Sequence, residues 1–214
     1  MKIGLLGTGD LATTLGTAWA SAGNTILLTG RNIQRARTAA EAIGDAATAV
    51  DPAELAGAVD VVVVAIPWAG LEEALSLVGA PKGTLAGKTV IDCTNPLDFA
   101  TGAMLPSSGS AAELIARVAD GANVVKALHM FAGGSWPFTG EPASSPVVAV
   151  CGDDPGSLRQ TETLIGGLGA RTVVVGGIDA ARQAEEAAGF VMRVVAAGAN
   201  PRFAVPDVDP GVRR

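Results

Sequence analysis

The residues with the clearest chemical role form a glycine turn near the start of the chain, Gly7-Thr8-Gly9-Asp10-Leu11-Ala12. A GxGxxA pattern that follows a strand and opens a helix is typical of dinucleotide sites. Gly7 allows the tight turn, Gly9 lets a pyrophosphate approach the backbone, and Ala12 keeps the helix close to the sheet. Because a helix N-terminus presents free N–H groups to phosphates, we expect a dinucleotide to contact Gly7, Thr8, Gly9, Asp10 and Leu11. The alternative is a glycine turn without a ligand, in a chain that holds 28 glycines.

The end of the next predicted strand indicates which dinucleotide binds. NAD enzymes usually carry Asp or Glu there, which binds the ribose hydroxyls. Here the position is Thr29 or Gly30, Arg31 follows, and Arg35 lies one helical turn further. A carboxylate would repel a 2′-phosphate, whereas a guanidinium binds it through charge-assisted hydrogen bonds. We therefore predict NADP, held at this end by Thr8, Gly30, Arg31, Asn32 and Arg35, although capping a helix is the simpler role of Asn32. The alternative is that the two arginines only solvate a helix start.

Further candidate residues stand where other predicted strands end, because ligands lie at the carboxyl ends of parallel strands. Those expected to contact the cofactor are Ala65, Ile66, Pro67, Trp68 and Asn95. Those expected to contact a second substrate are His129, Met130, Phe131 and Trp136. Asn95 either holds a carboxamide or substrate oxygen or caps the turn into Pro96, and we prefer the cap slightly.

His129, the only histidine in the chain, is the candidate catalytic residue. Reduction of a carbonyl or imine needs a proton donor, and a histidine at the end of a strand titrates near neutrality. Equally open is a histidine that is partly buried and hydrogen-bonded, or that only forms a wall beside a ring.

The residue types exclude several other chemistries. The chain has no tyrosine, so it lacks the Tyr-Lys pair of short-chain dehydrogenases and aldo-keto reductases. One histidine cannot form a His-rich metal site, and we predict no metal. Nothing next to Cys93 would lower its pKa, so a nucleophilic role is not expected. We expect Lys126 to form a salt bridge and Asp92 to be structural.

Large aromatic residues follow the sixth predicted strand. Trp136 and Phe138 lie close to Gly133 and Gly134, which suggests either a lid over an aromatic substrate or a dimer contact. The Ala/Val face of the last predicted helix suits close packing, either in the core or against a partner subunit.

These residues require strands and helices in alternation. Periodicity predicts strands near residues 2–6, 25–30, 46–50, 59–65, 88–92, 123–128, 146–151 and 171–175. It predicts helices near 10–22, 32–43, 71–78, 110–118 and 153–169, a short helix from Asp51 and a long one from Asp179, with a loop at 102–109. The pattern indicates an α/β fold, a Rossmann-type, doubly wound and mostly parallel sheet with a small C-terminal helical part. We divide the chain into an NADP-binding domain, residues 1–177, and a C-terminal helix and tail, residues 178–214, as a dimer or lid region.

Composition sets the remaining limits. The chain has 214 residues and a net charge of −6 without a basic tract, which argues against a nucleic-acid partner. The longest apolar runs have the length of a buried strand, so no membrane span is expected. The sequence starts directly with a strand and its two cysteines lack metal-type spacing, so we expect a cytoplasmic protein.

Several segments together resemble the NADPH:F420 oxidoreductase family. They are Gly7-Thr8-Gly9, Gly30-Arg31, Ala65-Ile66-Pro67-Trp68, Asp92-Cys93-Thr94-Asn95-Pro96-Leu97, Val125-Lys126-Ala127-Leu128 and Val150-Cys151-Gly152-Asp153-Asp154. The resemblance extends to about Ala199 and implies a Rossmann domain, a small C-terminal helical part, a homodimer, and hydride transfer between NADP and the deazaflavin coenzyme F420. It also implies that Thr8, Arg31 and Arg35 hold the 2′-phosphate and that Ile66, Pro67 and Trp68 line the nicotinamide. The chain departs from the family at Gly30, where a serine is usual, and at Leu128-His129, where a Phe-Asn pair is usual.

Three functional hypotheses follow. The first is an NADP-dependent oxidoreductase with F420 as acceptor, since hydride exchange between two ring cofactors needs mainly positioning. The second is an NADPH-dependent reductase of a small carbonyl or imine compound in specialised metabolism, in which His129 would supply a proton. The third is an NADP sensor without catalytic activity.

Overall fold

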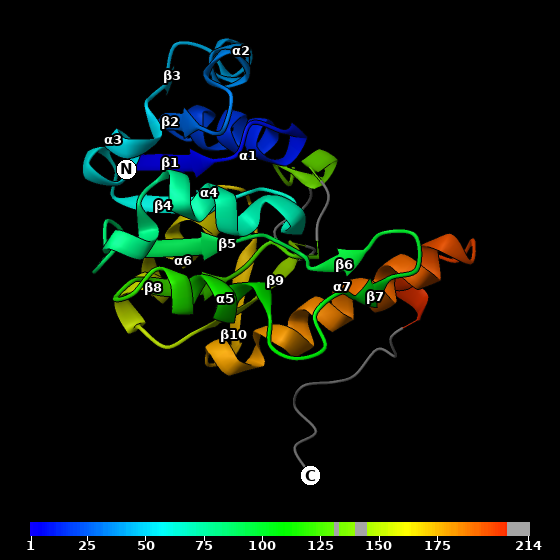
Figure 1. Ribbon diagram of the computed structural model, residues 1–214. Helices are drawn as coiled ribbons and strands as arrows, with labels where there is room; N and C mark the ends of the chain where they lie inside the picture. Colours follow the sequence, from blue (N-terminus) through cyan, green and yellow to red (C-terminus); the bar gives the residue numbers. More distant parts are fainter. Residues whose placement is uncertain (131–132, 140–144, 205–214) are drawn as a thin grey trace.

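The computed structural model describes residues 1–130, 133–139 and 145–204. In this part of the chain an eight-stranded sheet runs in the order β10-β9-β8-β5-β4-β1-β2-β3 (Figure 1). The strands are β1 (Lys2–Leu6), β2 (Thr25–Thr29), β3 (Ala47–Ala49), β4 (Val61–Val64), β5 (Thr89–Asp92), β8 (Asn123–Lys126), β9 (Val147–Gly152) and β10 (Arg171–Gly176). The helices are α1 (Asp10–Ser21), α2 (Ile33–Ile43), α3 (Pro52–Ala58), α4 (Leu71–Leu77), α5 (Ala111–Val118), α6 (Pro155–Gly166) and α7 (Ala181–Ala196). Short 3₁₀ turns are η1 (Trp68–Gly70), η2 (Ala80–Lys82), η3 (Gly133–Ser135), η5 (Ile178–Ala180) and η6 (Pro201–Phe203).

The sheet is mostly parallel, as predicted from the alternation of strands and helices. The one reversal is between β8 and β9, which pair antiparallel through Val125 with Gly152 and Lys126 with Cys151. Strand β10 then pairs parallel with β9. The carboxyl ends of β1, β2, β4, β5 and β8 therefore meet at one edge of the sheet, while β9 and β10 run the opposite way.

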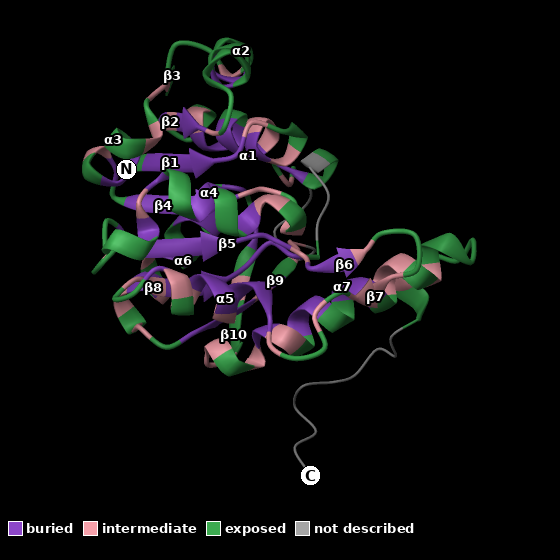
Figure 2. Ribbon diagram, in the orientation of Figure 1, coloured by how far each residue is buried: buried purple, intermediate pink, exposed green. Residues whose placement is uncertain are grey.

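Two separate cores cover the two faces of the sheet. Along β4, Val61 and Val63 belong to one core and Val62 and Val64 to the other, because side chains alternate along a strand. Helices α1, α2 and α6 contribute to the first core, and α3, α4, α5 and the start of α7 contribute to the second. The central strands β1, β4, β5 and β8 are largely buried between these layers, whereas the edge strand β10 is mostly exposed, as are the outer helix faces (Figure 2). The centre of the sheet is therefore buried on both sides, as the uninterrupted valine run of β4 indicates.

Trp19 fixes α1, the helix that follows the glycine turn. Its side chain is fully buried, and its indole Nε1 donates a hydrogen bond of 2.9 Å to the carbonyl oxygen of Leu164 in α6. Burial of a large aromatic side chain contributes about 2–3 kcal/mol to folding. The position of the turn is thus set by a packed core and not by the turn alone.

A small hairpin follows β5, and the sequence did not predict it. Strand β6 (Leu97–Asp98) pairs antiparallel with β7 (Ala103–Met104), inside a region that includes the predicted loop at 102–109. Two-residue strands are too short to show periodicity, so the prediction was wrong there. The hairpin packs on α7, where Gly102 and Gly189 lie so close that a Cβ on either would collide with the carbonyl oxygen of the other. In Figure 1 the hairpin and the second half of α7 extend beyond the edge of the sheet at which β1, β4 and β5 end.

The C-terminal helix begins later than predicted and belongs partly to the core. The predicted start at Asp179 lies in η5, and α7 begins at Ala181. Ala181 and Ala184 contribute to the second core, whereas Phe190 and Val195 are half-exposed. None of the helices in the described ranges is long and apolar enough to cross a membrane.

Candidate functional site

The glycine turn after β1 has the geometry that a dinucleotide turn requires. Gly7 has a φ of 139°, which disfavours any residue with a side chain. A Cβ at this position would also collide with the carbonyl oxygen of Ala65, so β1 and β4 could not approach as they do. The amide of Gly7 donates to the carbonyl oxygen of Thr29 at 3.0 Å, which ties the turn to the end of β2. At Gly9, by contrast, nothing lies within 4 Å of the place where a Cβ would be.

The first turn of α1 is left open for a ligand. Gly9 is its N-cap, and no side chain of the described residues accepts a hydrogen bond from the amides that follow. The neighbouring helix differs, because Asn32 caps α2 by accepting from the amides of Gln34 at 2.9 Å and Arg35 at 3.1 Å. The capping role that we expected for Asn32 is confirmed. The free amides of α1 and the open space at Gly9 suit an anion such as a pyrophosphate.

A pocket of about 460 Å³ joins these features. It brings together ten of the residues predicted to bind the cofactor, Gly7, Thr8, Gly9, Gly30, Arg31, Asn32, Arg35, Ala65, Ile66 and Pro67. Leu6, Gly70 and Ala74 complete its lining. Four predicted residues are not part of this lining, Asp10, Leu11, Trp68 and Asn95. Asp10 is exposed at the start of α1, and Trp68 packs partly against the second core.

The two arginines of the pocket differ in their ion pairing. Arg31 forms an ion pair with Glu73 of α4, with 2.9 Å between Nη1 and Oε2, and about two-thirds of each side chain is exposed. The Arg35 guanidinium has no hydrogen-bond or ion-pair partner among the described residues. The sequence did not suggest Glu73, since an acidic residue in the first turn of a helix is ordinarily explained by the helix dipole.

His129 lies beyond the pocket, after the end of β8, and is buried with 5% exposure. Burial and, secondly, the charge of Lys126 lower the pKa of His129 from 6.5 to about 4. The expectation that His129 titrates near neutrality was therefore wrong, and the imidazole is neutral at pH 7. The sequence could not show this, because the burial of His129 depends on how the chain turns after β8 ends at Lys126, with a φ of 59° at Leu128.

Asn95 connects the ends of β5 and β8. Its Nδ2 donates to the carbonyl oxygen of His129 at 2.8 Å, a contact across the sheet edge in place of the expected cap on the turn into Pro96. Two buried polar atoms, Asn95 Oδ1 and His129 Nδ1, have no hydrogen-bond partner within the described part of the chain. Unpaired polar atoms of this kind are costly unless a ligand or water satisfies them.

The predicted substrate residues around the next turn are only partly brought together. Met130 is partly exposed at 39%, and Phe131 lies outside the described residues. Trp136 is buried with 5% exposure as part of the first core, and Phe138 packs against that core. Trp136 is therefore part of the core, and it does not form the exposed aromatic lid or dimer contact that we expected. Apolar periodicity in a loop of few residues cannot separate a core anchor from a lid.

Lys126 lies in a fully buried charge cluster behind these strand ends. Its Nζ is 2.9 Å from Oδ2 of Asp92 and 2.8 Å from Oε1 of Glu185, and it also donates to the carbonyl oxygen of Thr94. All three charged side chains are inaccessible to solvent. The predicted salt bridge of Lys126 and the structural role of Asp92 are confirmed, while Glu185 of α7 was missed.

Two pKa shifts follow from this burial. Burial raises the pKa of Glu185 from 4.5 to about 7, against the opposing effect of Lys126. Burial, followed by the charge of Asp92, raises the pKa of the Cys93 thiol to about 12. Cys93 is thus protonated at neutral pH, which agrees with the expectation that it is not a nucleophile. No cluster of metal-binding side chains occurs among the residues that the structure describes.

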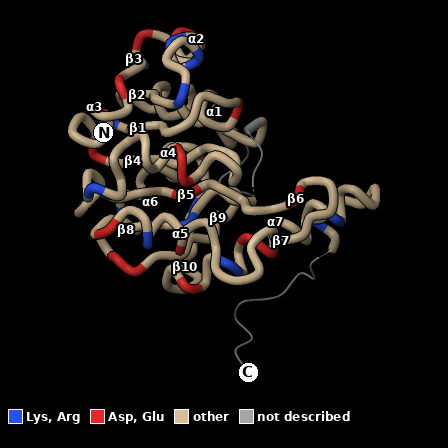
Figure 3. Tube along the Cα trace, viewed as in Figure 1, with Lys and Arg blue, Asp and Glu red and all other residues tan. Residues whose placement is uncertain are grey.

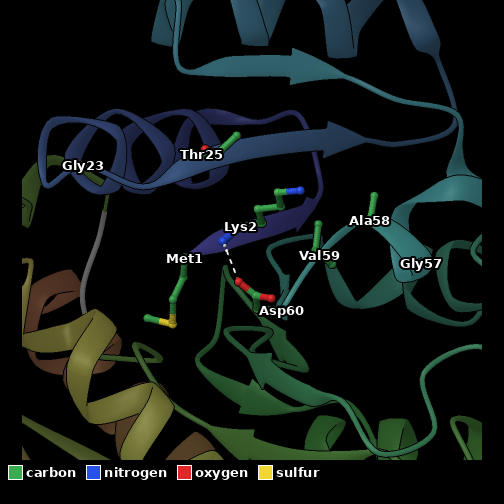
Figure 4. Close-up of a pocket in the computed structure, with 8 residues that line it drawn as sticks. All are labelled: Met1, Lys2, Gly23, Thr25, Gly57, Ala58, Val59 and Asp60. Carbon is green, nitrogen blue, oxygen red and sulfur yellow. Dashed lines mark hydrogen bonds between the residues drawn. The ribbon is translucent and has the colours of Figure 1, made fainter.

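A second hollow of about 460 Å³ lies at the opposite edge of the sheet (Figure 4). It is lined by Met1, Lys2, Gly23, Thr25, Gly57, Ala58, Val59 and Asp60. Several of its polar groups are already paired, since the amide of Lys2 donates to Asp60 at 2.8 Å and the terminal amine donates to Asn24. This hollow adjoins the amino ends of β1 and β2, so it lacks the strand ends that bind ligands in such sheets.

The chain is similar to known oxidoreductases. Residues 2–96 match a family described as NADP oxidoreductase, coenzyme F420-dependent, which confirms the resemblance seen in the sequence. NADP as cofactor and oxidoreductase chemistry are thereby supported at the level of this family. A candidate F420-dependent NADP reductase from Arthrobacter sp. FB24 has a similar structure, with a TM-score of 0.80 and 28% identity over 93% of this chain and 96% of that one.

More distant similarities show how widely the fold is shared. Rat metalloreductase STEAP3 is 26% identical over 86% of this chain, which spans only 36% of that protein's length. A reductive aminase from Aspergillus terreus, solved in complex with NADPH, has a TM-score of 0.68 and 20% identity, covering 92% of this chain and 63% of that one. These matches confirm the doubly wound α/β fold and its C-terminal helix.

Proposed function

We propose that the protein transfers hydride between NADP(H) and the deazaflavin coenzyme F420. The observation that carries this proposal is the pocket at the ends of β1, β2 and β4, which combines an open helix N-terminus with two arginines and no carboxylate at the end of β2. The family match over residues 2–96 and the similarity to the Arthrobacter protein support F420 as the partner.

The residues of the pocket fit each part of NADP. The open space at Gly9 and the uncapped amides of α1 suit the pyrophosphate. Arg35 and Arg31 suit the 2′-phosphate, because a guanidinium binds phosphate oxygens in pairs. Ile66 and Pro67 offer an apolar surface on the side of the pocket that leads to β5 and β8. When bound, NADPH supplies the hydride, and these residues hold the ring in position to deliver it.

The side chains beyond the pocket favour an acceptor that needs no strong acid from the protein. His129 is neutral at pH 7, the Cys93 thiol is protonated with a pKa of about 12, and Lys126 is held by two carboxylates. Exchange with a deazaflavin ring consumes one proton in the reducing direction, and a ring nitrogen in contact with water can take it from the medium. Asn95 Oδ1 and His129 Nδ1 are free to contact polar atoms of that ring.

The test is to mix the protein with NADPH and F420 and to follow the absorbance of both compounds. The two signals should change together, with one mole of F420 reduced for each mole of NADPH oxidised. A lack of exchange at micromolar enzyme would reject F420 as acceptor. NADPH oxidation with a carbonyl or imine compound would then favour the second hypothesis, and tight NADP binding without transfer to any acceptor would favour the sensor.

His129 distinguishes the two catalytic hypotheses. His129→Ala should change F420 exchange by no more than about tenfold, since one neutral hydrogen bond contributes about 0.5–1.5 kcal/mol. A loss of 100-fold or more is expected where a residue acts as the general acid. His129→Asn, which keeps a hydrogen-bonding group without an imidazole, is the matched variant.

The assembly and domain boundary are part of the same proposal. Phe190 and Val195 on α7, together with Phe203, expose apolar surface outside the sheet domain. Burial of such surface favours a homodimer through residues 178–214, the proposed C-terminal region. Sedimentation of the native chain and of Phe190→Ser would test it, because the substitution should shift a dimer toward monomer.

A further inference from the structure

Glu73 stands at the rim of the pocket and holds one of its two arginines. It belongs to the first turn of α4, between Gly70 and Ala74, both of which line the pocket. Arg31 lines the opposite side, after β2. The 2.9 Å ion pair between Arg31 and Glu73 therefore joins the two sides of the pocket. Figure 3 shows the same arrangement of charge, with acidic residues on α4 and basic residues at the start of α2.

We infer that Glu73 is a specificity-determining residue, which weakens binding of the 2′-phosphate by competing with it for Arg31. This inference rests on the proposed use of NADP. A phosphate that approaches Arg31 must displace the Glu73 carboxylate or lie beside it with the same sign of charge. Either event reduces the free energy gained when the phosphate binds Arg31. Binding to Arg35 carries no such loss, because Arg35 has no ion-pair partner in the described structure. The two arginines therefore contribute unequally to binding of the 2′-phosphate, and Glu73 determines the size of this difference.

The size of the effect follows from the exposure of the ion pair. Both side chains are about two-thirds exposed, so water and salt screen their interaction. Loss of the competing carboxylate should tighten NADP binding by about fivefold, as expected for a pair of this kind. NAD lacks the 2′-phosphate, so its binding should change by less than about twofold. Glu73 thus keeps affinity for NADP below what the two arginines would otherwise reach, which favours release of the oxidised product.

The experiment is a titration of NADP⁺ and NAD⁺ into the native chain, Glu73→Gln and Glu72→Gln. Glu72 is the matched control, because it lies next to Glu73 on the exposed side of α4 and its substitution removes the same charge. Only Glu73→Gln should tighten NADP⁺ binding, and the gain should shrink as salt rises. Equal tightening by Glu72→Gln, or no tightening by Glu73→Gln, would overturn the inference.

A second pair of variants tests whether the effect passes through Arg31. Glu73→Gln should have no effect on NADP⁺ binding in an Arg31→Ala background, and its full effect in an Arg35→Ala background. Tightening that persists without Arg31 would contradict competition for this arginine. Weaker NAD⁺ binding by Glu73→Gln, with NADP⁺ unchanged, would instead make Glu73 a ribose ligand and overturn the inference. Failure of the native chain to bind NADP⁺ more tightly than NAD⁺ would reject the proposed cofactor preference, a result separate from these.

Discussion

The proposed nucleotide half of the site and the proposed acceptor half are built in different ways. The nucleotide half depends mainly on residues 6–35, where a turn, a helix start and two arginines follow one another in the chain. The acceptor half depends on Asn95, His129, Lys126 and Glu185, which come from distant elements and meet only in the folded structure. The first half has open, solvent-facing donors, whereas the second has buried groups whose charges are altered by burial. Local patterns therefore specify the proposed cofactor pocket, and long-range packing specifies the proposed acceptor side.

The largest effect is expected in the buried cluster of the acceptor half. Lys126→Met leaves Asp92 and Glu185 buried without their cation. Removal of one partner from a buried ion pair costs about 3–5 kcal/mol, so the free energy of unfolding in urea should fall by that amount. Lys88→Met, at a partly buried lysine whose Nζ donates to the carbonyl oxygen of Val59, is the control and should cost less. Equal losses of unfolding free energy for the two variants would mean that the buried cluster contributes no more to stability than an ordinary lysine contact.

A comparably large effect is expected in the nucleotide half, where it should appear mainly as a loss of NADP⁺ affinity. Gly9→Val places a Cβ where the structure has only open space, so the fold should be retained at a cost of about 1 kcal/mol, because valine is a poor N-cap. The same side chain would occupy the position proposed for the pyrophosphate, and NADP⁺ affinity should fall by about 100-fold or more, roughly 3 kcal/mol. Gly57→Val also points into open space but lies at the other edge of the sheet, so it should bind NADP⁺ normally. Normal binding by Gly9→Val would place the cofactor elsewhere.

The pH dependence of stability should reveal Glu185. Its folded pKa, about 7, lies above the usual 4.5, so the folded chain holds a proton that the unfolded chain releases between these values. Stability is therefore highest below pH 4.5 with respect to this group and falls as the pH rises through 7, by roughly 1–3 kcal/mol. Glu185→Gln should remove this decline in urea titrations between pH 5 and 8. A decline of the same size in the variant would assign it to another group.

The smallest effect is expected at Asn95, which joins the two strand ends of the acceptor half. Asn95→Ala removes the hydrogen bond to the carbonyl oxygen of His129 and also an unpaired oxygen, so stability should change by less than about 1 kcal/mol. Hydride exchange with F420 should slow while NADP⁺ affinity stays the same. An equal loss of NADP⁺ affinity would show that the two halves are not separable at this residue.

The sequence predicted the fold and most of the residues that line the pocket, because both depend on local rules. A glycine with positive φ, an uncapped helix and a missing acid can be recognised within a few residues, and the run Val61 to Val64 indicates a strand buried on both faces. The acceptor half could not be predicted in this way. The pKa of His129 depends on burial and on a lysine whose partners include a residue of α7. Trp136 looked like part of a lid because its packing against the first core involves residues far away in the chain.

The reversal between β8 and β9 determines where the chain tolerates added length. After β1, β2, β4, β5 and β8 the chain emerges at the edge that carries the pocket. After β9 and β10 it emerges at the opposite edge, because these strands run the other way. A peptide tag or small reporter domain inserted after Asp153 or Gly177 would therefore project away from the cofactor. The same insertion after Thr29 or Val64 would enter the pocket. The direction of β9 and β10 therefore determines at which positions an inserted domain can be tolerated.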